Sequence, residues 1–359
     1  MPGKWFRCRR FRFVRIGQGN MTEDDNGQRR PHRNPTIKDV ARAAGVSSAT
    51  VSYVLNNLNK VTPEVDSHVR EVAARLGYSR NNAARALKTG QMNVIGCILP
   101  TLVSPVFPEI AQAVQARAES YGYATFVVDS GQDHSREEKA SELLLRHGVD
   151  GAVAVLSASP RKRLPPAFPL VVLDQRLEGL DSVRADHWTG GRLMAEELVR
   201  IGHRRVGLLS GEQSVASSLE RREGFLDGAR GRLEITWDIE VPLRPQLNDE
   251  AIVAISSAPR HGVTAIACAN DLVAIGALGI LHNNRIRVPD DISVIGFDGM
   301  EWSGWPLVDL TTVRQPLAEL GGRAVDILMA RLAEPDRPLQ QVALPVELVR
   351  RGSTAAPAF

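Results

Sequence analysis

Short apolar runs that alternate with helical stretches restrict the fold of this chain more than any other feature. Each run is four to six residues long, which suits a buried strand. Buried strands separated by helices are typical of parallel sheets covered on both faces. A first series of four runs and a second of three predict two α/β subdomains: Val94–Leu99, Ala124–Val128, Gly151–Val155 and Leu170–Leu173, then Val206–Leu209, Thr264–Cys268 and Ile292–Phe297.

The size and composition of the chain are those expected of a multidomain cytoplasmic protein. Its 359 residues, 43% of them hydrophobic, suit two or three domains. No apolar run approaches the roughly 20 residues of a membrane span, and arginines interrupt the N-terminus where a signal peptide would be apolar. The three cysteines, Cys8, Cys97 and Cys268, are far apart, so we expect no disulfide framework, no bound metal and no cofactor.

Charge is distributed unevenly along the chain. The net charge is only +3, but residues 1–90 hold 17 basic and 7 acidic residues, whereas residues 91–359 hold 27 and 34. A basic end on an acidic body is typical of a module that binds a polyanion. A basic unfolded tail is the alternative. Residues 35–90 still hold 8 basic and 4 acidic residues, so a tail explains only part of the asymmetry.

Residues 1–34 show no periodic pattern that supports folding. Arginines are mixed there with Trp5 and several phenylalanines, and the stretch then becomes polar. We expect a disordered basic extension, or a start codon assigned upstream of the true one, for which Met21 is a candidate. An arm that touches DNA is the less favoured interpretation.

Residues 35–79 carry the start and stop signals of three short helices. Apolar residues recur at helical spacing between these signals, and a glycine-containing turn of about four residues joins the first two helices. Two short helices joined in this way match the helix-turn-helix motif. The signals are Thr36 with Asp39, Gly45, Ser47, Thr62 with Pro63, and Gly77.

The second of these helices is the candidate DNA-reading element. In a helix-turn-helix unit it lies in the major groove, with its N-terminal side chains at base edges. Val51 is expected to point inward, and Ala49 is small enough to touch a thymine methyl. A three-helix bundle that binds no DNA is the alternative. The predicted DNA contacts are Thr36, Ser47, Ser48, Ala49, Thr50, Ser52, Tyr53 and Asn56.

The run from Thr36 to Asn56, T-I-K-D-V-A-R-A-A-G-V-S-S-A-T-V-S-Y-V-L-N, resembles the headpiece of the LacI/GalR family of transcription regulators, the lactose- and galactose-repressor type. The segments Thr62–Val65 and Leu76–Tyr78 extend the resemblance. It implies an α/β protein in which a helix-turn-helix DNA-binding headpiece is joined by a hinge to a periplasmic-binding-protein-like core of two doubly wound parallel-sheet subdomains. Tyr53 departs from the Arg or His that the family often has there, so the operator half-site cannot be borrowed from a relative.

The stretch from Asn81 to Lys88 would form about two helical turns, which are too few to be stable alone. The resemblance implies that residues 80–90 are a hinge helix, which folds in the minor groove on binding DNA and wedges Leu87 into the central base step. A polar linker is the alternative. The other predicted DNA contacts of the hinge are Asn82, Arg85 and Lys88.

Residues 91–359 resemble the effector-binding and dimerisation core of the same family. The matching segments include Val103–Phe107, Gly202–Val206, Val294–Asp298 and Thr311–Pro316. A helix from Leu317 to Leu332 is expected to cross back to the first subdomain. We therefore assign about 91–187 with 317–334 to the first subdomain and about 188–316 with 335–354 to the second.

Ligands of such folds lie in the cleft beyond the carboxyl ends of the strands. By the resemblance, Arg221 stands where the family has its ligand-binding arginine, and Asn270 and Asp298 each follow a predicted strand. An arginine, an amide and a carboxylate together suit sugar hydroxyls, which both donate and accept hydrogen bonds. The alternatives are that Asp298 only caps a turn, that Arg222 is the ligand, and that Phe107 belongs to the core. The predicted effector contacts are Phe107, Gln175, Arg176, Arg221, Asn270 and Asp298.

Together these features predict a repressor whose affinity for a pseudo-palindromic operator is controlled by a small-molecule effector. We expect a homodimer, with a tetramer as the open alternative. A carbohydrate is favoured as the effector over a nucleobase or a partner protein. No phosphate loop, nucleophile elbow or metal cluster indicates an enzyme, and His203 lies in a turn where structural use is favoured. An exported solute receptor would need a signal peptide and would lack the headpiece.

Overall fold

The computed structural model describes residues 35–55, 58, 60–78, 91–131, 133–156 and 168–358. The chain forms two compact units, Met1–Asn82 and Ala83–Phe359. No helix in the described ranges has the length and apolarity needed to cross a bilayer. The predictions made for the N-terminal extension and the hinge lie outside the described residues, as do those for Asn56, Asn82, Arg85, Leu87 and Lys88.

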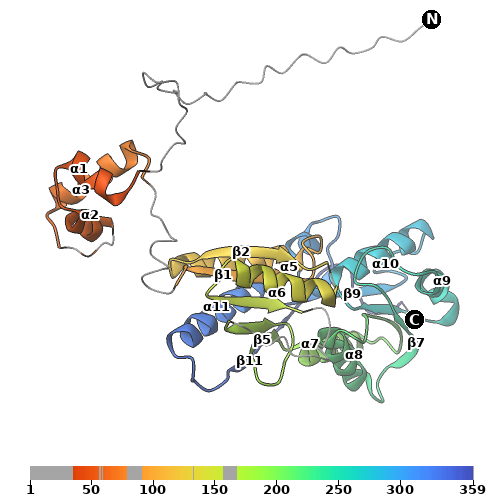
Figure 1. Cartoon of the computed structure of the whole chain (residues 1–359). Coiled ribbons are helices and arrows are strands. Elements are labelled where there is room, and N and C mark those ends of the chain that lie inside the picture. Colours follow the sequence, from red (N-terminus) through yellow and green to blue (C-terminus); the bar gives the residue numbers. More distant parts are fainter. Residues whose placement is uncertain are drawn as a thin grey trace, which may run out of the picture. The chain divides into compact units, whose positions relative to one another are not determined.

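The described residues of the first unit contain three helices (Figure 1): α1 (Ile37–Ala44), α2 (Ser48–Leu55) and α3 (Pro63–Arg75). At the start of α1, the Asp39 carboxylate accepts hydrogen bonds from the backbone N–H (2.9 Å) and the hydroxyl (2.6 Å) of Thr36. Such a cap satisfies polar groups that the first turn leaves without helical partners. The small core of this unit consists mainly of valines, which include Val40, Val51, Val54, Val69 and Val72.

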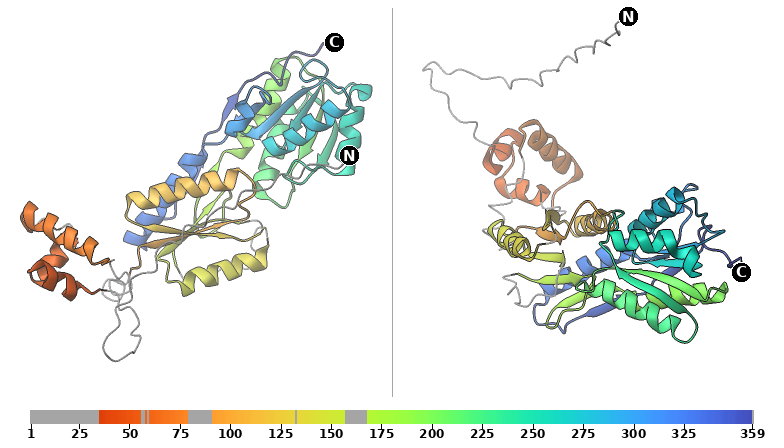
Figure 2. Two further views of the ribbon diagram at one scale, coloured as in Figure 1. Left: turned by 90° about the horizontal axis from the view of Figure 1, so that it is seen from above. Right: turned by 90° about the vertical axis from the view of Figure 1, so that its right-hand side faces the viewer.

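In the part of the second unit that the structure describes there are two six-stranded sheets, and the first of them is entirely parallel, in the order β11-β5-β4-β3-β1-β2. Helices α5 and α11 cover one face of this sheet and α6 covers the other, as the left view of Figure 2 shows. Each aliphatic side chain buried between these layers contributes roughly 1.5–3 kcal/mol. The elements are β1 (Val94–Leu99), α5 (Val106–Ser120), β2 (Ala124–Asp129), α6 (His134–Arg146), β3 (Gly151–Val155), β4 (Leu170–Leu173), β5 (Asp181–Ala185), α11 (Leu317–Ala333) and β11 (Gln341–Leu344).

The second sheet has the order β12-β10-β9-β8-β6-β7, and only its edge strand β12 runs antiparallel to its neighbour. Helices α7 and α8 pack on one face, and α9 and α10 pack on the other. The elements are α7 (His187–Arg200), β6 (Arg205–Ser210), α8 (Ala216–Ala229), β7 (Glu234–Glu240), α9 (Asp249–Ser257), β8 (Ala265–Cys268), α10 (Asp271–Asn283), β9 (Ser293–Asp298), β10 (Thr311–Arg314) and β12 (Glu347–Val349), with short 3-10 helices at Ala258–His261 and Glu301–Gly304.

The chain passes between the two sheets three times, from β5 to α7, from β10 to α11 and from β11 to β12. Our assignment of residues 335–354 to the second subdomain is therefore wrong for β11, which pairs in parallel with β5 of the first sheet. β11 carries no run of buried apolar residues that would mark it as a core strand. β5, with the sequence DSVRA, is likewise not recognisable as an apolar run, although most of its residues are buried.

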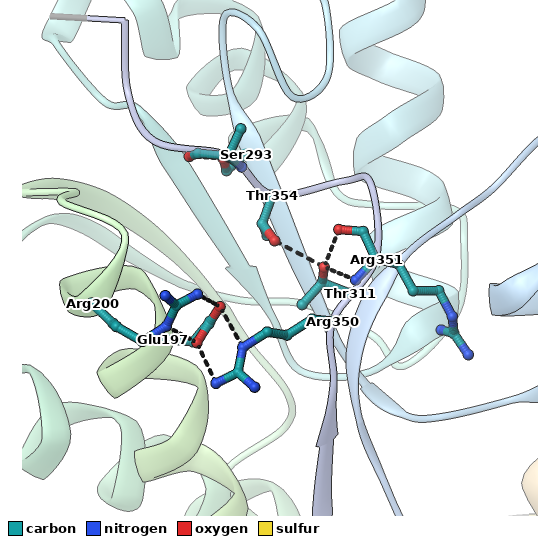
Figure 3. A network of polar contacts seen from close by, with 8 residues as sticks. Glu197, Arg200, Ser293, Thr311, Arg350, Arg351 and Thr354 are labelled. Carbon is teal, nitrogen blue, oxygen red and sulfur yellow. Dashed lines mark hydrogen bonds and ion pairs between the residues drawn. The ribbon is translucent and has the colours of Figure 1, made fainter.

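A polar network ties the C-terminal segment to α7 and to the second sheet (Figure 3). The Glu197 carboxylate, 2% exposed, accepts two hydrogen bonds each from Arg200 and Arg350, at 2.6–3.0 Å. Farther along the segment, the hydroxyls of Thr311 and Thr354 lie 2.8 Å apart. The hydrogen bonds from Arg200, followed by those from Arg350, outweigh the effect of burial and lower the pKa of Glu197 to about 2.

We predict that Glu197→Gln lowers the free energy of unfolding by about 3 kcal/mol near pH 7, because the two guanidinium groups stabilise the ionised form of this carboxyl. This stabilisation is present above the ordinary pKa of 4.5 and is lost as the pH falls toward about 2. Urea unfolding followed by circular dichroism should therefore show a smaller difference between variant and parent near pH 4 than near pH 7.

The neighbouring Glu196 provides the control, because its ion pair with Arg192 is partly exposed. Glu196→Gln should change the free energy of unfolding by less than about 1 kcal/mol. Equal losses for the two variants, or a loss for Glu197→Gln that does not depend on pH, would contradict the assignment.

Candidate functional site

The N-terminal half of α2 presents small side chains to solvent. Ser48 and Ala49 are exposed, whereas Val51 is fully buried in the core of the first unit. The Ser47 hydroxyl accepts a hydrogen bond from the backbone N–H of Thr50 at 3.0 Å, so Ser47 caps the helix. Small exposed side chains at a helix N-terminus allow the backbone to approach a partner surface closely.

Several other predicted DNA contacts of the first unit already interact with side chains of the same unit. The hydroxyls of Ser47 and Thr50 lie 2.9 Å from each other. Tyr53 is 37% exposed, and the Lys60 ammonium lies 5.3 Å from the centre of its ring. The Thr36 hydroxyl is used in the cap of α1. Ser48, Ala49 and Tyr53 are therefore the most accessible of the predicted DNA contacts, with Ser52 half-buried on the same helix.

A cavity of about 380 Å³ opens beyond the carboxyl ends of strands from both sheets. Parallel strands bring side chains that follow different strands to one edge of a sheet. A volume of this order fits a small organic molecule. Within the described residues, no group of three or more His, Cys, Asp or Glu side chains could hold a metal ion. The lining includes an apolar wall with Phe107, and the polar side chains of Asp174, Arg221, Asn270, Asp298 and Gln315.

Arg221, on α8, carries a buried positive charge at the wall of this cavity. Its side chain is 10% exposed, and its Nη1 donates to the carbonyl of Ala269 at 2.9 Å. The same nitrogen lies 3.5 Å from the carboxylate of Asp298, and the guanidinium carbon lies 4.1 Å from the ring centre of Phe297. Its Nε donates to Nδ1 of His187 at 3.2 Å. A buried guanidinium is stable only with such partners.

Arg222, the alternative ligand in the sequence analysis, is directed elsewhere. Its Nε donates to the carboxylate of Asp238 on β7 at 2.6 Å, and Arg222 does not line the cavity. Of these two neighbouring arginines, Arg221 is the one that lines the cavity.

Two aspartates at strand ends lie near Arg221, one from each sheet. Asp174 directly follows β4 and has a φ of 67°, and Asp298 ends β9 and has a φ of 110°. These left-handed conformations are strained for residues other than glycine, and they persist only where the surrounding structure holds them. Positive φ at both strand ends is the kind of strain that clusters at binding sites.

The two aspartates differ in charge. Burial raises the pKa of Asp298 to about 7, against the attraction of Arg221 and a hydrogen bond from Gln315. Burial acts on Asp174 in the same direction, but His187, Arg221 and Ser217 together outweigh it and lower its pKa. The two aspartates of the cavity thus differ, because the pKa of Asp174 lies below its ordinary value and that of Asp298 is raised to about 7.

The six predicted effector residues do not all meet at the cavity. Phe107, Arg221, Asn270 and Asp298 line it. Gln175 is instead buried and donates to the carbonyl of Leu156 at 3.1 Å. Arg176 is exposed, and neither residue is among the lining residues. The structure places Asp174 at this wall, together with His187 behind it. Asp174 directly follows an apolar run, as Asp298 does, and Asn270 follows one after a single residue, so the same signal could have identified it.

Asn270 and Phe107 each serve two purposes. The Asn270 side-chain oxygen accepts from the backbone N–H of Val273 at 2.8 Å and so caps α10, while the residue also lines the cavity. Phe107 packs against the core of the first sheet and lines the cavity as well. Asp298 accepts a hydrogen bond from the Gln315 side chain at 2.8 Å, which holds its carboxylate in place.

Comparison with known proteins shows the family. The family model of bacterial regulatory proteins, lacI family, matches residues 36–81, and that of the periplasmic binding protein-like domain matches residues 195–354. The transcriptional repressor PurR of Haemophilus influenzae is 32% identical over 330 residues, which cover 89% of this chain and 98% of the relative. PurR of Mannheimia succiniciproducens is 33% identical over 331 residues, with the same coverage. The chain belongs to the LacI family.

Solved structures of the LacI family share the fold. The Lac repressor dimer bound to operator and the anti-inducer ONPF gives a TM-score of 0.78 at 28% identity, covering 90% of this chain and 100% of that one. A LacI family regulator from Enterococcus faecium with bound ribose gives 0.65 at 25% identity, covering 73% and 99%. The predicted family and the predicted α/β fold with a helix-turn-helix headpiece are confirmed, and the chain is a DNA-binding transcriptional repressor of this family.

Asp298→Asn is predicted to raise the free energy of unfolding near pH 8 by up to about 4 kcal/mol, because ionising this buried carboxyl costs stability. The neutral form of Asp298 contributes fully to the stability of the folded protein below the ordinary pKa of 3.8. This contribution is lost as the pH rises through about 7, the pKa in the folded protein. Parent and variant should therefore converge toward pH 4 in thermal unfolding. A variant less stable than the parent near pH 8 would show that attraction between Asp298 and Arg221 outweighs burial.

Proposed function

We propose that this repressor binds a pseudo-palindromic operator as a homodimer, through the exposed face of α2, and that a small polar effector in the cleft controls this binding. A carbohydrate is the effector that the cleft favours. The observation that carries the proposal is the convergence of Arg221, Asp174, Asp298 and Asn270 on one cavity with an apolar wall. An effector acts by its difference in affinity for two arrangements of the core.

The chemistry of the cavity favours a polyhydroxylated ring. A sugar hydroxyl donates to a carboxylate and accepts from a guanidinium or an amide N–H, and all three groups are present. Phe107 offers an apolar surface on which one face of a sugar ring can lie, and it is the single aromatic residue among the described lining. The Enterococcus faecium regulator, which shares the fold, holds ribose.

A nucleobase is the second candidate. The amide, carboxylate and arginine groups of the cleft can also pair with the edge of a heterocycle. The most similar curated proteins reported above are PurR repressors, which keeps this candidate open for the present chain.

We predict that Arg221→Met abolishes the effector response and that Arg222→Met preserves it. Both substitutions replace an arginine on the same helix, but only Arg221 lines the cavity. The full-length protein would be heated with D-ribose, D-glucose, D-galactose, hypoxanthine or guanine, because a ligand of the folded state raises the melting temperature. A sugar should stabilise the parent and Arg222→Met, and should leave Arg221→Met unshifted. If only a base stabilises the parent, the effector is a nucleobase and not a carbohydrate. If both variants respond equally, the effector does not bind at Arg221.

On the DNA side, Ala49→Glu should weaken operator binding by at least tenfold, since it places a carboxylate on the surface expected to face phosphates and base edges. Ala74→Glu makes the same change on the exposed face of α3 and serves as the control. Operators would be selected from genomic fragments with the parent protein, and affinity would be measured by fluorescence anisotropy at fixed salt. Equal losses for the two variants would contradict the role of α2.

A further inference from the structure

His187 is a fully buried histidine at the first residue of α7, where the chain first crosses from one sheet to the other. Its ring packs against Phe297, with 5.9 Å between the ring centres. Two charged side chains flank it. The carboxylate of Asp174, which follows β4, lies 2.7 Å from Nε2, and Nε of Arg221, on α8, lies 3.2 Å from Nδ1.

The neighbours of His187 determine which ring nitrogen carries the proton. A guanidinium only donates hydrogen bonds, so Nδ1 must accept from Arg221. The ionised carboxylate of Asp174 only accepts, so Nε2 must donate to it. His187 is therefore held as the neutral tautomer protonated on Nε2. Each nitrogen matches one partner, and the other tautomer would break both bonds.

This arrangement fixes the direction of the Arg221 guanidinium. Its Nε is held by His187, its Nη1 by the carbonyl of Ala269, and its face by the ring of Phe297. Among the hydrogen bonds of the described residues, none involves Nη2 of Arg221, and the residue lines the cavity. A guanidinium held at Nε and Nη1 keeps the N–H groups of Nη2 for oxygen atoms of a ligand.

Close approach of α7 and α8 brings His187 within reach of Arg221. A Cβ atom added to Gly191 would lie 2.0 Å from the carbonyl oxygen of Arg221, and one added to Gly224 would lie 1.9 Å from that of Trp188. Any side chain at these two positions would push the helices apart. The two glycines thus set the spacing on which the bond between His187 and Arg221 depends.

We propose that His187 is a positioning residue of the cleft, which joins Asp174 of the first subdomain to Arg221 of the second and so presents both groups to the effector as one unit. The proposal rests on the proposed effector site. It adds that the buried imidazole of His187 sets the relative positions of the Asp174 carboxylate and the Arg221 guanidinium, which the effector contacts together.

A spectroscopic experiment tests the proposal without any ligand. Full-length protein labelled with ¹⁵N-histidine has eight histidines, and the His187 signals are identified by their loss in His187→Leu. Long-range ¹H–¹⁵N spectra near pH 7.5 should show His187 as the neutral tautomer protonated on Nε2. Arg221→Met should shift the Nδ1 signal, because its hydrogen bond is lost. The Nδ1-protonated tautomer, an imidazolium, or an Nδ1 signal unchanged in Arg221→Met would overturn the proposal.

An affinity experiment tests the consequence for the effector. The compound that stabilises the parent in the panel of sugars and bases is titrated by calorimetry. His187→Leu should raise its dissociation constant at least tenfold, and His187→Asn should recover most of this loss, because the amide oxygen can take the place of Nδ1 as acceptor for Arg221. His203→Leu is the control, since His203 is also buried and bonds Thr264, outside the cavity lining, at 2.8 Å.

The outcomes separate the two proposals. Unchanged affinity in His187→Leu, or an equal loss in His203→Leu, would overturn the positioning role while leaving the cleft as the effector site. If no compound of the panel stabilises the parent, the proposed effector class fails, and the spectra alone decide the role of His187.

Discussion

Parallel pairing of the strands is the constraint on which the rest of the core depends. In both sheets every strand except β12 runs in one direction, so their carboxyl ends lie along one edge. Most returns to the start of the next parallel strand use a helix, and these helices cover both faces of each sheet, whereas β4 and β5 are joined by a short loop. Polar residues at or just after the carboxyl ends of β4, β8 and β9 consequently reach one cavity, although they are far apart in the sequence.

Several features of the cleft lower the stability of the folded protein. Asp298 is buried in a form that resists ionisation, two aspartates adopt left-handed backbone conformations, and a guanidinium is held out of water. Each of these features costs free energy in the absence of a ligand and prepares the site to bind one. The small unit with α1, α2 and α3 differs from the cleft. Its core consists mainly of valines, and the exposed side chains at the start of α2 are small.

Prediction from sequence succeeds where the physical signal is local. Helix caps such as Thr36 and Ser47 and apolar runs such as β1 are recognised from neighbouring residues. β11 is not, because its partner β5 lies far away in the sequence. Our prediction names Gln175, which does not line the cavity, although Asp174 directly follows the apolar run of β4 and carries the local signal that could have identified it. His187 meets Arg221 only because two glycines let α7 and α8 approach, a tertiary effect that no motif records.

The three passages of the chain between the sheets mean that neither subdomain is a continuous stretch of the gene. A premature stop codon shortly after α11 would remove β11 from one sheet and β12 from the other, leaving β5 and β10 as open edges that invite aggregation. A single exchanged stretch of the gene therefore could not replace one subdomain by that of a paralogue. A block exchange in the gene would have to take the whole core, Ala83–Phe359, because only the core as a whole is continuous in the sequence.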